Sequence, residues 1–224
     1  DAVADGSLLE QPMHRGLPAE LRRVVDMSFS GDGEPTTCTD FPALLDHVLA
    51  ERTRLGLDLK VVVLSNNSMA HRPSIKAALA RLAAAGGQLH AKLDAGDEAG
   101  YLRVDRSAVT WSRSLENLAL AAQIAPLTIQ TLICSVDGVF MGREEARGYA
   151  AILASVLDQG GSIERIDLHT VERKPPFNHV KGLPQSYLRS LAEFLINSDQ
   201  RLAGKLFCTA GQSAYLIEGQ DLEF

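Results

Sequence analysis

The sequence has little cysteine, few aromatic residues and no long apolar run. Only three of its 224 residues are cysteine, and they lie far apart, at Cys38, Cys134 and Cys208. Such an odd, dispersed set, without CxxC or CxxxCxxC spacing, predicts neither a disulfide framework nor a cysteine-rich metal site. No stretch approaches the roughly 20 apolar residues of a membrane helix, and no signal peptide opens the chain. These absences favour a cytoplasmic protein without membrane contact.

The remaining composition is that of a globular domain. Apolar residues make up 46% of the chain and charged residues 22%, and the 18 glycines and 9 prolines are close to average, which excludes collagen-like and disordered classes. The net charge of −6 argues against a broad polyanion-binding surface but leaves room for a local basic pocket. Because no linker divides the chain, we expect a single domain over residues 1–224. Its parts are a helical lead-in (1–23), βα units (24–198) and a C-terminal extension (199–224).

Short runs rich in β-branched residues alternate with helical patterns. The expected strands are Val24–Ser30, Leu59–Ser65, Gln88–Asp94, Leu127–Cys134 and Ile163–His169. Each is apolar for most of its length, which is typical of strands covered on both faces. The helical patterns start near Phe41, Pro73, Ser114, Ala146 and Pro184. This alternation predicts an α/β fold with a parallel sheet, either a partial barrel or a doubly wound sheet. Lys205–Ala210 has a weaker strand pattern.

Polar residues gather where the expected strands end. The segments concerned are Ser30–Thr36, Ser65–Asn67, Lys92–Asp94 and His169–Arg173. In a parallel α/β sheet, ligands bind beyond the carboxyl ends of the strands, because the loops converge there. We therefore expect these segments to line one crevice.

The first two segments have both a binding and a structural interpretation. Gly31 and Gly33 permit backbone angles that are closed to other residues. Their turn can therefore bring main-chain atoms against a ligand. The alternative interpretation is an ordinary βα turn. The turn matches neither the GxGxxG fingerprint nor a P-loop. Asn66 either donates to a ligand carboxylate or caps the following loop.

The charged residues at the later strand ends also have two interpretations each. Lys92 and Asp94 are two residues apart, so in a regular strand they share a face and form either a structural ion pair or the walls of a charged site. Arg173 suits an anionic group or is a solvated charge. The histidines show no HxH or HExxH spacing, and no GxSxG elbow is present, so zinc and serine-hydrolase chemistry are not indicated.

Taken together, five motifs in order resemble the radical S-adenosylmethionine superfamily. The central two are Ser28-Phe29-Ser30-Gly31-Asp32-Gly33-Glu34-Pro35-Thr36 and Lys92-Leu93-Asp94-Ala95. Similarity to the branch of wybutosine-type tRNA-modifying synthases rests also on Leu64–Asn67, Ile129–Leu132 and Val171–Pro176. The match covers about Val24 to Leu195, most of the chain.

The resemblance implies a partial (β/α)6 TIM-like barrel that binds S-adenosylmethionine across its strand ends. Gly31, Asp32, Gly33 and Glu34 would form the Gly-Gly-Glu-like segment, with Asp32 at a glycine position. Asn66 or Lys92 would meet the methionyl carboxylate, and Asp94 the ribose. The segment containing Thr131 would pack on the adenine, and Arg173 is the candidate contact to the substrate.

The missing CxxxCxxC is the departure from the family. There, three cysteines hold a four-iron four-sulfur cluster, and reduction of the bound cofactor releases a 5′-deoxyadenosyl radical that acts on the substrate. The resemblance implies a small-molecule or RNA-base substrate and an electron donor such as flavodoxin or ferredoxin. Because the chain starts at Asp1, we expect the cluster loop and a first strand upstream, and hence an open or segment-covered edge on Val24–Ser30.

Two other functions are compatible with the same residues. A barrel lyase or aldolase would use Lys92 as a Schiff base and Asp94 as a proton relay. A nucleoside-binding module without a cluster would use the same crevice without turnover.

Overall fold

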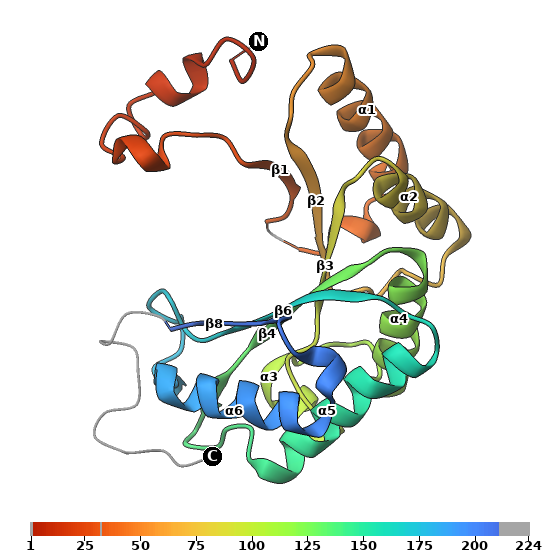
Figure 1. The fold of residues 1–224 in the computed structure, drawn as a ribbon, viewed down its shortest axis with the longest axis vertical. Coiled ribbons are helices and arrows are strands. Elements are labelled where there is room, and N and C mark those ends of the chain that lie inside the picture. Colours follow the sequence, from red (N-terminus) through yellow and green to blue (C-terminus); the bar gives the residue numbers. More distant parts are fainter. Residues whose placement is uncertain (1, 32, 211–224) are drawn as a thin grey trace.

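The computed structural model describes residues 2–31 and 33–210. Its main sheet has six parallel strands in the order β1-β2-β3-β4-β6-β8. They are β1 (Asp26–Phe29), β2 (Lys60–Ser65), β3 (Gln88–Lys92), β4 (Leu127–Leu132), β6 (Ile163–His169) and β8 (Leu206–Thr209). The expected α/β class is therefore confirmed, and the curved sheet is a partial TIM-like barrel (Figure 1).

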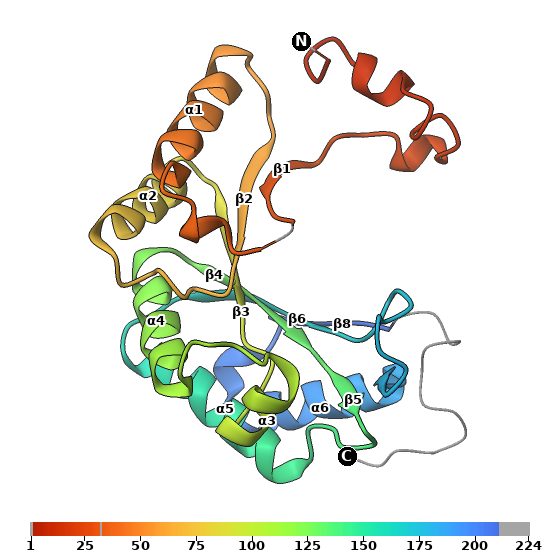
Figure 2. The same ribbon diagram turned by 180° about the vertical axis from the view of Figure 1, so that it is seen from behind.

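The helices cover one side of this sheet (Figures 1 and 2). The layer consists of α1 (Phe41–Arg54), α2 (Pro73–Ala84), α4 (Trp111–Ile124), α5 (Arg143–Asp158) and α6 (Gln185–Ser198), packed in that order. The core lies between them and the sheet and includes Leu45, Val63, Leu79, Leu89, Ile129 and Leu153. No helix in the described ranges combines the length and the hydrophobicity that a bilayer crossing requires.

Only one face of the sheet is fully covered, which corrects the expectation of strands buried on both faces. In β3, Leu89 and Ala91 are buried under the helices, whereas Gln88, His90 and Lys92 are partly exposed on the opposite, concave face. Successive side chains of a strand point to opposite faces, and a partial barrel leaves its inner face open.

The remaining short elements lie near the two ends of the chain and in the connections between the strands and helices. Short 3-10 turns occur at Ser7–Glu10, Ala19–Leu21, Pro35–Thr37 (η3) and Gln200–Leu202 (η4), and a short helix, α3 (Glu98–Val104), follows β3. The expected strand Leu127–Cys134 is split, because Cys134–Val136 (β5) leaves the sheet and pairs antiparallel with Val180–Gly182 (β7). The weak pattern at 205–210 does form a strand, β8.

Strand β1 lies at the end of the sheet and, within the described residues, pairs only with β2. This agrees with the expected open edge. The preceding segment leaves apolar side chains exposed: Met13 is 76% exposed, Leu21 60% and Val25 57%.

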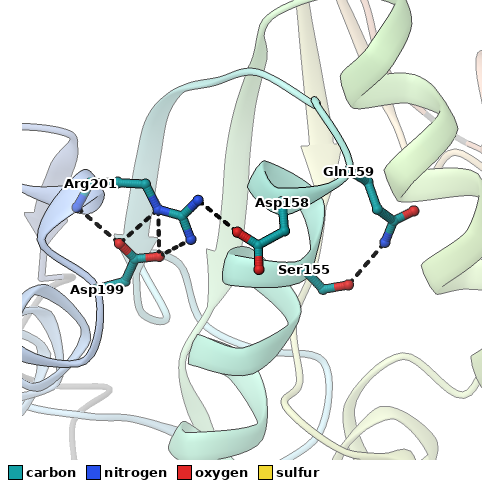
Figure 3. A network of polar contacts seen from close by, with 5 residues as sticks. All are labelled: Ser155, Asp158, Gln159, Asp199 and Arg201. Atoms are coloured by element: carbon teal, nitrogen blue, oxygen red, sulfur yellow. Dashed lines mark hydrogen bonds and ion pairs between the residues drawn. The ribbon is translucent and has the colours of Figure 1, made fainter.

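At the other end of the sheet, polar contacts connect the end of α5 to the turn that precedes β8 (Figure 3). Arg201 of η4 binds Asp158 at the end of α5 at 2.8 Å and Asp199 at 2.6 Å. The Arg201 guanidinium lowers the pKa of Asp199 through its hydrogen bonds. Because α5 ends where β6 begins and η4 precedes β8, this network lies at the amino ends of the strands, away from the expected crevice.

Two glycines bring the loop after β3 into close contact with α5. A Cβ at Gly148 of α5 would lie 2.2 Å from the carbonyl oxygen of Gly96, and one at Gly96 would lie 1.8 Å from the carbonyl oxygen of Glu145. Backbone therefore packs directly on backbone, and this contact fixes the loop that carries Asp94.

Gly148→Ala should lower the free energy of unfolding by about 1–3 kcal/mol, because the added methyl overpacks this contact. Helix propensity alone would make the alanine variant more stable by roughly 1 kcal/mol. A decrease in the free energy of unfolding would therefore point to the overpacked contact. Urea denaturation measures the change, and Arg147→Ala, at an exposed ion pair on the same helix, should change stability by no more than ~0.5 kcal/mol. A Gly148→Ala protein as stable as the wild type would contradict the described contact.

Candidate functional site

Two adjoining cavities occupy the rim where β1, β2 and β3 end. The first, the glycine-turn compartment, has a volume of about 340 Å³ and is lined by Ser30, Gly31, Gly33, Glu34, Leu64, Ser65, Asn66 and Lys92. The second, the acidic compartment, has about 230 Å³ and is lined by Asn66, Lys92, Leu93, Asp94, Tyr101, Asp105, Ser107, Val109 and Ser114. Asn66 and Lys92 line both, so they join the two compartments.

The strand register explains this convergence. Phe29 is level with Val63, Ser65 with Ala91, and Lys92 with Gln130. Parallel neighbours therefore end side by side, and the segments that follow β1, β2 and β3 meet at one rim.

The glycine turn has the backbone that the sequence predicts. Gly31 and Gly33 have φ angles of 131° and 120°, which side chains other than glycine rarely adopt. No heavy atom would lie within 4 Å of a Cβ at either position. Both glycines are exposed and line the compartment. The Gly31 carbonyl oxygen accepts the Gly33 amide at 3.0 Å, which closes the turn. Asp32, predicted with them, lies outside the described residues.

The Glu34 carboxylate fastens this turn to the end of β2. Its Oε1 accepts hydrogen bonds from the Thr36 amide at 3.0 Å and the Ser65 hydroxyl at 2.8 Å, and its Oε2 accepts from the Asn66 amide at 2.7 Å. Thr36 adds a hydroxyl donor to Oε1. Both oxygens of Glu34 are thus engaged within the protein, so its side chain shapes the compartment.

Asn66 has the capping role that the sequence left open. Its Oδ1 accepts the Ser68 amide at 2.9 Å, which supports the loop after β2. The side chain is nevertheless exposed and lines both compartments.

Asp94 is held by the neighbouring strand. Its Oδ1 accepts the backbone amide of Leu132 at 2.6 Å, across the gap between the ends of β3 and β4. Burial raises the pKa of Asp94, and the nearby Lys92 ammonium and the Leu132 amide oppose that shift. Lys92 and Asp94 thus line the same compartment, as their spacing predicts.

Asp105 belongs to this site although sequence reasoning missed it. It follows α3, which had no clear helical pattern, and it lines the acidic compartment. Burial raises the pKa of Asp105 to about 7, and the Asp94 carboxyl adds to the shift. Within α3, the Asp97 cap and the Arg103–Glu145 ion pair at 2.6 Å are the contacts that hold the helix in place.

Two predicted residues lie elsewhere. The Thr131 side chain is fully buried and hydrogen-bonded to the Tyr149 hydroxyl of α5, on the helix-covered face of β4. Its side chain is therefore not at the rim, because it alternates with Gln130 and Leu132. Arg173 is exposed in the segment after β6 and lines neither compartment.

The residues in the described ranges offer no metal centre. No group of three His, Cys, Asp or Glu side chains there is arranged to hold a metal ion. Cys38 is exposed, Cys134 is buried and Cys208 is half-buried, in separate parts of the fold. Burial raises the pKa of Cys134 to about 11, which disfavours the thiolate that an iron–sulfur cluster needs.

Glu34→Gln should destabilise the protein by about 1–3 kcal/mol, because an amide nitrogen cannot accept the hydrogen bonds that one carboxylate oxygen now receives. Thermal or urea unfolding measures the loss. Glu193→Gln, at an exposed position of α6, is the charge-matched control and should be near neutral. Equal effects of the two substitutions would contradict the role given to Glu34.

Comparisons with known proteins agree on the fold alone. No protein-family model matches the chain, and no curated protein does. A solved radical SAM methyltransferase from Sphaerobacter thermophilus matches with a TM-score of 0.52 at 12% identity, covering 84% of this chain and 51% of its own. An arginine decarboxylase from Paramecium bursaria Chlorella virus matches at a TM-score of 0.32 and 9% identity, covering 93% and 62%; this likeness is too low to support an argument. The chain thus spans about half the length of the methyltransferase, and its fold is similar to that of the matched part of this structure.

Proposed function

We propose that this chain is the S-adenosylmethionine-binding barrel of a radical SAM enzyme. The observation that carries the proposal is the adjacency of the two compartments: the exposed glycine turn and Asp94 line neighbouring cavities that share Asn66 and Lys92. A fold like that of a radical SAM methyltransferase supports it.

The crevice suits the charges of a sulfonium nucleoside. The main-chain oxygen of Gly33 would accept from the methionyl amino group, and Lys92 would pair with the methionyl carboxylate. Asp94 would accept from a ribose hydroxyl, since an ionised carboxylate is an acceptor only. The adenine would lie along the end of β4, against the half-buried Leu132 and backbone polar groups.

The family's four-iron four-sulfur cluster does not fit the residues present. In the described ranges, no cysteine triad or other metal-holding group exists. Binding and orienting the nucleoside is therefore the role we assign to these residues, and no electron-transfer step is assigned to them. The reductive cleavage, an electron donor such as flavodoxin or ferredoxin, and the cytoplasmic location remain parts of the proposal that the family resemblance suggests.

The substrate is proposed at the level of class. The motif order favours the wybutosine-type branch and hence an RNA base, with a small molecule as the other class. Arg173, exposed after β6 on the same side as the other strand ends, is proposed as the contact to an anionic group such as a phosphate.

Calorimetry with S-adenosylmethionine on the 224-residue chain tests the binding role. We expect a Kd of about 0.1–1 mM, because no cluster in the described residues adds to the contacts. Lys92→Met and Asp94→Asn should each weaken binding about tenfold, equivalent to ~1.4 kcal/mol. Lys60→Met, at the other end of β2, and Arg173→Ala are the controls that should leave binding unchanged.

Other results separate the alternatives. Saturation at micromolar ligand without iron would favour the binding module. Absence of binding at millimolar ligand, or unchanged binding in both crevice variants, would refute the proposal. The lyase alternative rests on the position of Lys92 beside Asp94 in a cavity; borohydride trapping of a carbonyl substrate on Lys92 would favour it.

A further inference from the structure

The carboxyl groups of Asp94 and Asp105 line the same acidic compartment and interact with each other there. Ionised carboxylates only accept hydrogen bonds, so a hydrogen bond between two carboxyl groups requires a proton on one of them. A proton shared by the two carboxyl groups would link the residue that follows β3 to the residue that follows α3.

The surroundings of the two carboxyls differ. Asp94 accepts the Leu132 amide at 2.6 Å, and a hydrogen bond of this kind favours the ionised form. The Oδ2 atom of Asp105 is buried and receives no hydrogen bond from any residue in the described ranges. A buried oxygen without a donor costs far more in an ionised carboxylate than in a neutral carboxyl group. Asp105 is therefore the member that keeps the proton.

We propose that Asp105 is a positioning residue of the candidate site: in its protonated form it donates to Asp94 and holds that carboxylate in place to accept a sugar hydroxyl. This role rests on the proposed function for the identity of the ligand. Asp105 itself acts through Asp94.

The proton makes this positioning dependent on pH. Burial and the Asp94 carboxyl raise the pKa of Asp105 to about 7, and Lys92 opposes the shift. Because the pKa is raised, the proton and its hydrogen bond are present below about pH 7 and are lost as the pH rises through that value. Above it, two carboxylates repel each other and Asp94 loses its orientation. The other titratable groups that interact electrostatically with Asp94 are Lys92 of β3, Cys134 of β5, Tyr149 of α5 and His169 of β6.

The binding test compares the wild type with Asp105→Asn at about pH 6 and about pH 8.5, on either side of the Asp105 pKa. Wild-type affinity for S-adenosylmethionine should fall at least about threefold more than that of the variant at the higher pH, because the asparagine amide donates at either pH. The amino group of the ligand titrates equally in both experiments and cancels in the comparison. Asp105→Leu, which cannot donate, should bind weakly at both pH values.

A second measurement requires no ligand. In ¹³C-carboxyl NMR of Asp-labelled protein, one aspartate should titrate near pH 7. Asp105→Asn should remove that titration, and Asp94→Asn should move it to lower pH, because the neighbouring charge is gone. Asp58→Asn, exposed before β2, is the control that should leave it in place and should confirm that the fold tolerates such a change.

The outcomes distinguish this inference from the proposed function. Binding of S-adenosylmethionine with equal pH dependence in wild type and Asp105→Asn, or no aspartate titrating near neutral pH, would overturn the role of Asp105 and leave the function standing. A titrating pair in a protein that binds no S-adenosylmethionine at either pH would confirm the shared proton and refute both the proposed function and the positioning role.

Discussion

Parallel pairing of all six strands is the constraint on which the candidate site depends. Because each strand runs in the same direction and neighbours are nearly level, the segments after β1, β2 and β3 must emerge at one rim. Helices cover only the outer face of the sheet, so the concave face keeps polar side chains such as His90 and Lys92. Main-chain atoms, a lysine and a pair of carboxyls thereby reach one crevice from segments far apart in the sequence.

The rim is held in shape by contacts of two kinds. On one side the Glu34 carboxylate gathers donors from η3 and from the end of β2. On the other, the loop after Asp94 packs by backbone contact on α5 through Gly96 and Gly148. The Glu34 contacts satisfy polar groups at a partly buried place, where an unpaired polar group would be costly. The glycine contact lets two backbone segments approach without side chains between them. These contacts position the residues that are proposed to meet a ligand.

The described side chains at the rim provide hydrogen-bond acceptors and a cation. In the proposed function these groups would bind and orient a charged nucleoside. The parallel α/β fold, which is similar to that of a radical SAM methyltransferase, accounts for the placement of the crevice, and the side chains at the rim would account for its selectivity in the proposed function.

The sequence alone determined the alternation of strands and helices, because apolar periodicity and glycine or proline punctuation are local properties. It also located the glycine turn and the Lys92–Asp94 pair, since strand ends must converge in a parallel sheet. The burial of Thr131 under α5 followed from strand alternation, once the helix-covered face was known. Only the tertiary structure placed Asp105 in the same compartment as Asp94, because α3 has no strong pattern of its own and packing against Glu145 sets its place.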